Sequence, residues 1–211
     1  MDIIDRDIED WLYAQQPAPV GVLQAMEQEG KAAGFPIVGP LVGRLLQQWA
    51  QSIGARRVFE MGSGFGYSTA WFAAAVGPDG LVVHTDGSSK LSAAARQWLG
   101  KTGSVGWVRF EVGDAVTILA AEPAGELFDI VFIDIDKDGY PAAWQEARTR
   151  VRRGGLIIAD NTLWSGRVLS PADADPATQG IIDYNRLALG DPDFLTTILP
   201  LRDGVAVSLR L

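Results

Sequence analysis

Acidic side chains follow the apolar stretches of this chain and are the residues best placed for chemistry. They are Glu60, Asp86, Asp114, Asp134 and Asp160. If the apolar stretches are parallel strands of one sheet, these carboxylates meet at a single edge, where open α/β sheets bind their ligands. An edge of this charge attracts a cation. Asp86 or Asp114 alone could equally cap the helix that follows it, but the repeated placement favours a ligand site.

Three oxygen-bearing side chains at the ends of two such stretches, Asp134, Asp160 and Asn161, could bind one hard cation. Two carboxylates, an amide and water molecules suit Mg²⁺, with Mn²⁺ or Ca²⁺ as alternatives, better than Zn²⁺, which prefers nitrogen and sulfur. The chain has no cysteine and a single histidine, His84, so thiolate and histidine-rich metal sites are excluded. The competing interpretation is that Asp160 and Asn161 form an ordinary turn.

Residues 58–68, VFEMGSGFGYS, combine an apolar run, an acid, alternating glycines and the start of a helical pattern. The pattern predicts a buried strand, a turn that a ligand can approach closely, and a helix whose free N–H groups face that ligand. The dinucleotide fingerprint requires glycine where Tyr67 stands, no lysine follows as in a P-loop, and Ser63 lacks the flanking glycines of a nucleophile elbow. Glu60 indicates a cationic ligand rather than a pyrophosphate. A plain strand–helix turn is the alternative.

The elements that must position these residues alternate between strand and helix. Strands are predicted at 57–61, 81–85, 107–112, 128–133 and 155–159. Helices are predicted at 67–76, 89–99, 114–121, 140–151 and about 177–189. This alternation predicts an α/β fold with a mostly parallel, doubly wound sheet. Two last strands, near 194–199 and 204–210, should form a hairpin around Arg202-Asp203-Gly204, with one strand antiparallel to the rest.

Three helical patterns precede the first strand, at 3–14, 20–32 and 41–52. Because they have no strands of their own, we expect them to pack on the sheet or on a partner subunit. Residues 165–177 form the longest polar loop and suit a substrate lid. We predict a single domain over 1–211, with an N-terminal helical segment over 1–52 and an α/β core over 57–211.

The overall charge of the 211-residue chain narrows the choice of partner, since a net charge of −8 argues against nucleic acid and anionic membranes. The acidic start has no signal-peptide pattern, and no apolar run approaches the roughly 20 residues of a membrane span. The cytoplasm is therefore the expected compartment.

Four ordered stretches resemble the cation-dependent O-methyltransferases, the family of catechol O-methyltransferase and caffeoyl-CoA O-methyltransferase. Residues 60–68 resemble its E-x-G-x-x-x-G-Y-S motif, and residues 132–140 its F-I-D-A-D-K-x-x-Y motif. Residues 153–168 resemble G-G-x-I-x-x-D-N-x-L-W-x-G-x-V. Asn185 and residues 199–204 resemble a later asparagine and L-P-x-x-D-G. The match runs from about residue 34 to the end, and the order of the motifs makes it specific.

The resemblance implies a seven-stranded Rossmann-like methyltransferase fold, S-adenosylmethionine as cofactor, a small aromatic substrate and a homodimer. It implies that the metal ligands are Asp134, Asp160 and Asn161, with Lys137 beside the reacting oxygen. The implied cofactor-binding residues are Val38, Glu60, Gly62, Ser63, Gly64, Tyr67, Ser68, Asp86, Gly113, Asp114, Ala115 and Asp134. Among these, Asp86 is expected on the ribose, and Asp114 with Ala115 beside the adenine.

The chemistry fits this expectation. The cofactor is a sulfonium cation, which an acidic strand edge attracts. A phenol ionises only near pH ~10, and a divalent cation on vicinal oxygens favours its phenolate form. Lys137 could accept the phenolic proton as the catalytic base. Trp164 could pack against the aromatic ring of the substrate, or it could be an ordinary core tryptophan. His84, inside an apolar strand, is expected to be a hydrogen-bonded core residue.

We therefore predict a Mg²⁺-dependent O-methyltransferase acting on a catechol-like small molecule. A module that binds S-adenosylmethionine without turnover is the second interpretation, and the complete set of Lys137 and metal ligands argues against it. An NAD-dependent oxidoreductase on the same kind of sheet is the third, weakened by the missing dinucleotide fingerprint.

Overall fold

The computed structural model describes residues 3–211 and contains one seven-stranded sheet. The strand order is β3-β2-β1-β4-β5-β7-β6. Strands β1 to β5 run parallel, while β7 is antiparallel to both β5 and β6. The predicted α/β class and the antiparallel C-terminal hairpin are therefore confirmed. The strands are β1 Arg57–Met61, β2 Leu81–Asp86, β3 Val108–Val112, β4 Phe128–Ile133, β5 Val151–Ala159, β6 Phe194–Leu199 and β7 Val205–Arg210.

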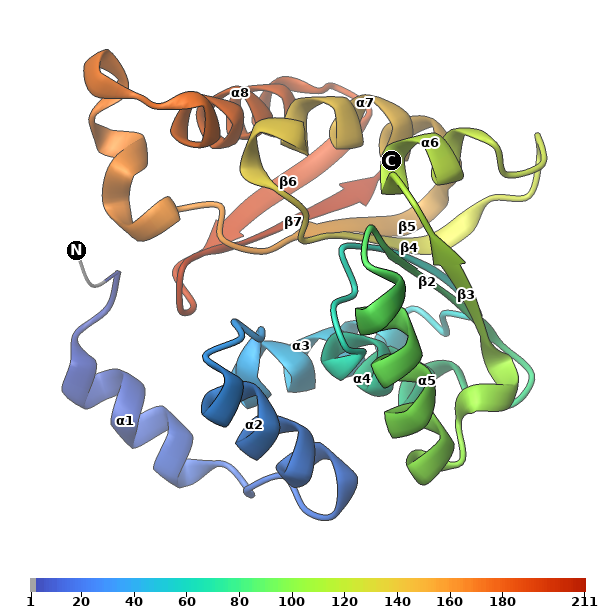
Figure 1. Cartoon of the computed structure of the whole chain (residues 1–211). Coiled ribbons are helices and arrows are strands. Elements are labelled where there is room, and N and C mark those ends of the chain that lie inside the picture. The colour runs from blue at the N-terminus through green and yellow to red at the C-terminus, as the bar shows by residue number, and fades with distance from the viewer. Residues whose placement is uncertain (1–2) are drawn as a thin grey trace.

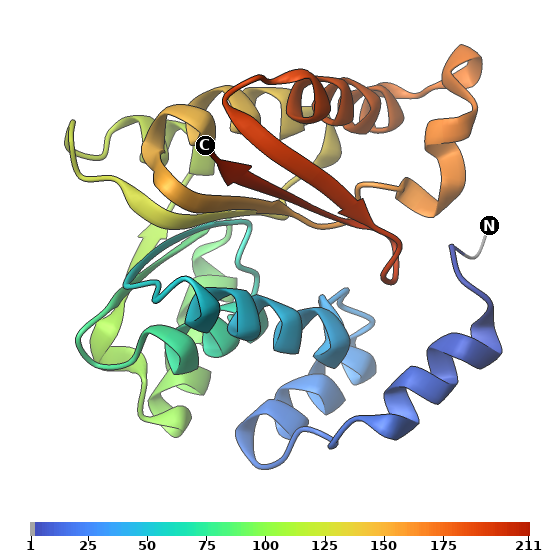
Figure 2. The ribbon, with the colours of Figure 1, turned by 180° about the vertical axis from the view of Figure 1, so that it is seen from behind.

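Helices cover both faces of this sheet (Figures 1 and 2). Helices α6, α7 and α8 form the layer on one face, and α3, α4 and α5 form the layer on the other. The helices are α1 Arg6–Gln15, α2 Val22–Ala33, α3 Gly39–Ser52, α4 Tyr67–Val76, α5 Ser89–Thr102, α6 Ala115–Ala120, α7 Tyr140–Arg150 and α8 Pro176–Gly190. Short 3₁₀ turns add η1 Val105–Trp107, η2 Lys137–Gly139, η3 Trp164–Leu169 and η4 Pro171–Asp173.

Each face of the sheet has its own hydrophobic core, because successive strand residues point to opposite sides. In β1, Phe59 packs toward α6, α7 and α8, whereas Val58 packs toward α3, α4 and α5. Trp144 of α7 and Tyr184 of α8 are fully buried and meet edge to face. Burial of this apolar surface holds the strand ends in fixed relative positions.

The N-terminal helices differ in how firmly they join this body. Helix α3 buries Val42 and Leu46, and α2 buries Met26, as the prediction of packing against the sheet layers requires. No residue of α1 is buried, and α1 lies at the periphery of the molecule in both views (Figures 1 and 2). Within residues 3–211, no helix has the length and apolar character needed to cross a membrane.

One strand begins earlier than predicted. Strand β5 starts at Val151 instead of residue 155, directly after α7 ends at Arg150. Its register on β4 shifts between Phe128 and Ile130, which marks a bulge. Gly154, with φ of 73°, absorbs the irregularity. The glycine pair at 154–155 has the composition of a turn, which hid the first residues of the strand.

Most of the predicted polar loop at 165–177 forms 3₁₀ turns. The 3₁₀ turns η3 and η4 occupy most of it, and α8 begins at Pro176, where Asp175 caps the helix by accepting from the Thr178 N–H at 2.7 Å. Ser165 and Gly166 both have positive φ and interrupt η3. Short i to i+3 turns leave no hydrophobic period, so the sequence pattern could not reveal them.

Candidate active site

The carboxyl ends of the parallel strands meet at one edge, as predicted. The backbone N–H of Asp134 donates to the carbonyl of Met61 at 2.9 Å, and that of Asp160 donates to the carbonyl of Ile133 at 3.1 Å. These bonds place the end of β4 beside the ends of β1 and β5. Strand order reverses between β1 and β4, so this is the switch point at which open α/β sheets bind ligands.

The glycines after β1 are required by close approach and by backbone conformation. Gly62 has φ of 81°, and a side chain there would begin 2.1 Å from the carbonyl oxygen of Asp134. Gly66, at φ of 90°, precedes the first turn of α4, and a Cβ there would lie 2.9 Å from Ala95. Only glycine fits such positions, because L side chains rarely adopt this region of φ. The turn therefore brings bare backbone to the edge of the sheet.

Asp86 ties this turn to β2. One carboxylate oxygen accepts the Gly64 N–H at 2.9 Å, and the other accepts the Ser88 N–H at 2.7 Å. Each oxygen has a second lone pair that can accept a ribose hydroxyl. The carboxylate thus shapes the turn in addition to the cofactor contact predicted for it.

Asp114 caps α6, the alternative that we considered from the sequence. Its side chain accepts the Thr117 N–H at 2.7 Å, and hydrogen bonding to Thr117 lowers the pKa of the carboxyl. Gly113 and Ala115 flank the cap, and the Gly113 N–H donates to the Asp86 carbonyl at 3.0 Å. Capping and a ligand contact are compatible, so the cofactor role of this segment stays a prediction.

Two of the predicted cofactor residues lie behind the glycine turn. Glu60 has no accessible surface and accepts from the Thr69 hydroxyl at 2.5 Å. Burial raises the pKa of Glu60 to about 7. The Tyr67 hydroxyl donates to Glu27 of α2. Both side chains support the turn from the core, which the spacing of the motif could not reveal.

Ser63, Ser68 and Val38 are the other predicted cofactor residues, and all three are mostly buried beside the turn. The Ser63 N–H donates to the Thr85 carbonyl at 2.9 Å, and the Thr85 N–H donates to the Ser63 hydroxyl at 3.1 Å. This exchange locks the end of β1 to β2.

The prediction for His84 is confirmed. It is fully buried, and its ring nitrogens lie 3.2 Å from the Thr69 hydroxyl and 3.3 Å from that of Ser92. Burial lowers the pKa of His84 to about 4. A neutral, hydrogen-bonded imidazole of this kind serves the core rather than a metal.

Asp160 and Asp134 form the part of the edge best suited to a cation. Asp160 is only 4% exposed, and its Oδ1 has no hydrogen-bond partner in the part of the chain that the structure describes. Burial first, and then repulsion from Asp134, raise the pKa of Asp160 to about 7. A cation between these carboxylates would relieve both costs.

The third predicted ligand, Asn161, follows directly in a left-handed conformation with φ of 58°, which asparagine tolerates better than most residues. Among residues 3–211 no group of three or more His, Cys, Asp or Glu side chains is arranged to hold a metal. A cation here would therefore take an amide or water oxygens besides Asp134 and Asp160. That donor set is typical of Mg²⁺.

Lys137 lies at the mouth of β4, where the motif places it. Its Nζ donates to Asp134 Oδ1 at 2.9 Å and to the Tyr140 hydroxyl at 2.9 Å, and its side chain is 11% exposed. The Tyr140 hydroxyl in turn donates to the Asp160 carbonyl at 2.8 Å. Tyr140 therefore connects the lysine to the end of β5, a role that we did not assign although the residue belongs to the motif.

Trp164 is partly buried, with its ring centroid 5.9 Å from Lys137 Nζ. It packs against the hydrophobic core between the sheet and helices α6 to α8, so the interpretation as a core tryptophan stays open. Its predicted contact with an aromatic acceptor stays a prediction.

The loop after Asp160 is held by the β6–β7 turn and by α8. The Thr162 N–H donates to the Gly204 carbonyl at 3.0 Å, and the Leu163 N–H donates to the Asp203 carbonyl at 2.9 Å. Asn185 of α8 donates its amide to the Thr162 carbonyl at 2.8 Å. The later motif residues thus position the loop, which explains why residues so distant in sequence accompany it.

A cavity of about 330 Å³ opens beside this loop. It is lined by Ile3, Ile4, Glu9, Asp160, Asn161, Ser165, Arg202 and Asp203. The space is large enough for a small aromatic molecule. Ile3, Ile4 and Glu9 near the N-terminus, and Arg202, were not among the predicted site residues. No local sequence pattern marks them as part of a site.

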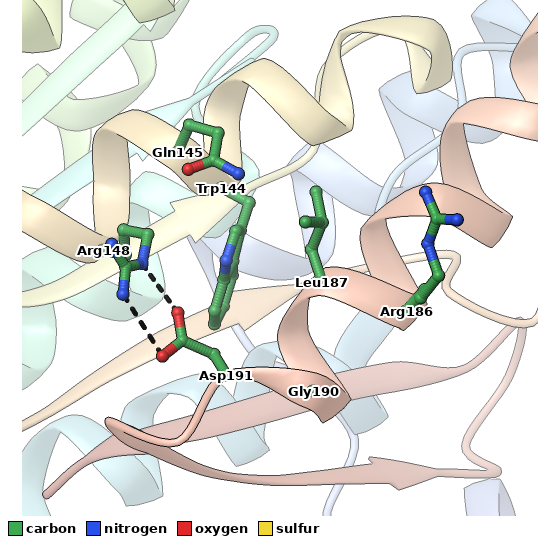
Figure 3. Close-up of a pocket in the computed structure, with 7 residues that line it drawn as sticks. All are labelled: Trp144, Gln145, Arg148, Arg186, Leu187, Gly190 and Asp191. Atoms are coloured by element: carbon green, nitrogen blue, oxygen red, sulfur yellow. Dashed lines mark hydrogen bonds and ion pairs between the residues drawn. The ribbon is translucent and has the colours of Figure 1, made fainter.

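A second cavity of about 230 Å³ lies between α7 and α8 (Figure 3). The close-up shows Arg148 and Asp191 facing each other, with donor–acceptor distances of 2.6 and 3.2 Å. Burial acts to raise the pKa of Asp191, but the hydrogen bonds from Arg148 and the Asp193 N–H, together with the positive charges of Arg148 and Arg210, outweigh it and the pKa is lowered. Arg148 and Asp191 therefore satisfy each other, and Arg186, which also lines the cavity, pairs with Asp183 at 2.9 Å.

Comparison with known proteins agrees with the strand-edge site. A family model described as O-methyltransferase matches residues 27–211. The chain belongs to this O-methyltransferase family. The resemblance seen in the motifs is confirmed, and the match begins somewhat earlier than residue 34. As an O-methyltransferase the chain is an enzyme, so the oxidoreductase interpretation is wrong.

Relatives match over nearly the whole chain. A catechol O-methyltransferase of Niastella koreensis is 32% identical, covering 98% of this chain and 96% of the relative. A catechol O-methyltransferase of Mycobacterium tuberculosis is 36% identical over 81% of this chain and 76% of its own length. The structure of an O-methyltransferase from Bacillus cereus in complex with SAH has a TM-score of 0.88 and 29% identity, covering 97% of each chain. That of TomG from Streptomyces achromogenes with SAM also scores 0.88, at 27% identity over 97% and 96% of the two chains.

Proposed function

We propose that this O-methyltransferase transfers the methyl group of S-adenosylmethionine to one hydroxyl of a vicinal diphenol, with a divalent cation held by Asp134, Asp160 and Asn161. The observation that carries the proposal is the buried Asp160 carboxylate, whose Oδ1 has no partner among the described residues and which faces a second carboxylate. Two relatives named catechol O-methyltransferase support the choice of acceptor.

The cofactor is assigned to the edge formed by β1, β2 and β4. Gly62 and Gly64 let the turn pack closely on the Asp134 backbone and the Phe35 ring, and Asp86 offers acceptors for ribose hydroxyls. The acidic side chains along the edge favour a sulfonium cation over a neutral or anionic ligand. Relatives crystallised with SAM and SAH support this cofactor.

In the proposed reaction, the protein residues orient the acceptor and accept one proton from it. A bound divalent cation would favour the phenolate form of the acceptor. Lys137 in its neutral form accepts the phenolic proton at Nζ, which is oriented by the Tyr140 hydroxyl. Methyl transfer from sulfur then requires the oxygen in line with the methyl group, ~3 Å away. The Trp164 ring, whose centroid lies 5.9 Å from Lys137 Nζ, could pack against the aromatic ring of the acceptor.

The test is a methyl-transfer assay over vicinal diphenols, with and without Mg²⁺, and with matched monophenols as controls. We expect turnover of diphenols only, loss of turnover in excess chelator, and recovery with Mg²⁺ or Mn²⁺. Full activity in chelator would overturn the metal assignment. Equal activity on monophenols would overturn the acceptor class.

A further inference from the structure

Arg202 occupies a conformation that a side chain of its size rarely adopts. It lies in the turn between β6 and β7 with φ of 51°. A left-handed conformation is unfavourable for a non-glycine residue, and such residues concentrate at functional sites. The turn itself is closed by the Gly204 N–H, which donates to the Leu201 carbonyl at 2.9 Å, so the arginine side chain is not needed to form it.

Most N–H donors of the Arg202 guanidinium have no hydrogen-bond partner within residues 3–211. Nη1 donates to the Ile37 carbonyl at 2.8 Å. Within residues 3–211 it forms no ion pair and no further hydrogen bond, although a guanidinium carries five N–H donors. It packs over Gly39, where a Cβ would lie 2.9 Å from Nη1 and 3.4 Å from the Tyr13 hydroxyl. Arg202 and Tyr13 therefore present polar groups to the same place.

Arg202 also lines the acceptor cavity, together with Asp160 and Asn161, and the apolar side chains of Ile3 and Ile4 form part of the same wall. An acceptor whose vicinal oxygens lie at Asp160 and Asn161 would extend its far end between the apolar side chains of Ile3 and Ile4 and the guanidinium of Arg202. A planar guanidinium is the side chain best matched to a carboxylate.

We propose that Arg202 binds a carboxylate on the acceptor, so that the preferred substrates are vicinal diphenols bearing an acidic substituent. Glu9 and Asp203 also line the cavity, so a substrate carboxylate is favoured only where the guanidinium compensates their charges. This inference rests on the proposed function, since it assumes that the diphenol end lies at Asp160 and Asn161.

The experiment compares 3,4-dihydroxybenzoate with 3,4-dihydroxybenzamide, which has nearly the same shape and no charge. For the wild-type enzyme we expect a KM for the benzoate ~10–100-fold below that for the amide, the worth of a charge-assisted hydrogen bond. Arg202→Met should remove most of this ratio with little change in KM for the amide. Arg202→Lys should keep part of it. Arg186→Met, at a surface arginine outside this cavity, is the matched control and should leave the ratio unchanged.

A structural role for Arg202 predicts a different result. If the bond to Ile37 matters only for folding, Arg202→Met would lower the melting temperature and impair both acceptors equally, and this would overturn the proposal. Equal KM values for the two acceptors in the wild type would overturn it as well. If neither acceptor is methylated, the proposed function fails, and calorimetry with 3,4-dihydroxybenzoate decides about Arg202 separately. Binding that Arg202→Met abolishes supports the subsite, and binding that it leaves unchanged overturns it.

Discussion

Two cavities of this molecule each bring an aspartate and an arginine to their walls, one between α7 and α8 and one at the carboxyl ends of β4 and β5. Between the helices, Arg148 and Asp191 are joined by two hydrogen bonds (Figure 3). At the strand edge, Asp160 and Arg202 form no ion pair with each other. Paired charges stabilise the fold, whereas charges left apart in a cavity are available to a ligand.

The pKa values of the two aspartates express the same difference. The pKa of Asp160 is raised to about 7 by burial and by Asp134, so its ionised form is disfavoured in the folded protein. The pKa of Asp191 is lowered, because the hydrogen bonds from Arg148 and the Asp193 N–H and the nearby arginine charges together outweigh the effect of burial. A buried carboxylate with a raised pKa costs stability at neutral pH, and such groups concentrate at functional sites.

The largest effect on kcat is expected for Lys137, which lies at the strand edge and has no counterpart in the cavity between α7 and α8. Lys137→Ala should lower kcat by ~10²–10⁴, the usual worth of a general base, because the phenolic proton loses its acceptor. Cofactor and metal affinities, measured by calorimetry, should change little, and raising the pH should partly rescue the rate. Lys90→Ala, at an exposed lysine of α5, is the control. Wild-type kcat in the Lys137 variant at neutral pH would show that the metal alone activates the acceptor.

The second prediction tests the cost of the unpaired carboxylate. In metal-free protein at pH 8, Asp160→Asn should raise the free energy of unfolding by ~1–4 kcal/mol, because an amide avoids the buried charge. A raised folded pKa gives no penalty below the unfolded value of 3.8, and the penalty grows as pH rises toward about 7. The difference between variant and wild type should therefore vanish near pH 4.

Excess Mg²⁺ should reverse the order of the two proteins, because only the wild type gains stability from tight metal binding. Thermal unfolding at three pH values, with and without Mg²⁺, measures both effects. A variant less stable than the metal-free wild type at pH 8 would contradict the contrast between the two cavities.

Asp86 provides a third, intermediate effect. Asp86→Ala should weaken S-adenosylmethionine binding by ~1–3 kcal/mol, through lost hydrogen bonds to the ribose and a loosened turn at Gly64. Asp86→Asn, which keeps one acceptor oxygen, should lose less. Asp79→Ala on an exposed loop serves as the control in calorimetry. Unchanged affinity in Asp86→Ala would remove this residue from the cofactor site.

The smallest effect on activity is expected at the helix cavity. Asp191→Asn should leave kcat and KM unchanged and lower the free energy of unfolding at pH 7 by ~1–3 kcal/mol, because the pair with Arg148 is broken. Since the folded pKa of Asp191 is lowered, this stabilisation exists above the unfolded value of 3.8 and is lost as pH falls below it. Denaturant unfolding at pH 7 and pH 3 checks the sign. A change in KM would mean that this cavity takes part in function.

Local patterns were sufficient for much of the fold. The bounds predicted for β1, α4 and β4 agree with the structure, because each has a continuous apolar period between strong turn signals. Strand alternation also predicted that the acids would share one edge, since parallel strands joined by helices point the same way. The same reasoning could not detect the bulge in β5 or the 3₁₀ turns after Asn161, where glycines and polar residues conceal ordered backbone.

Tertiary structure alone decided which charged groups line a cavity and which are enclosed by the core. Residue types and spacing predicted Glu60 for the cofactor and Asp160 for the metal, and both are buried, but only Asp160 lines the cavity beside the loop after β5. Ile3 and Arg202, about 200 residues apart in sequence, line that cavity together. The physical reason is that periodicity reports only which face of an element is apolar. Which elements then meet, and which charges remain unpaired between them, depends on contacts between segments that share no local signal.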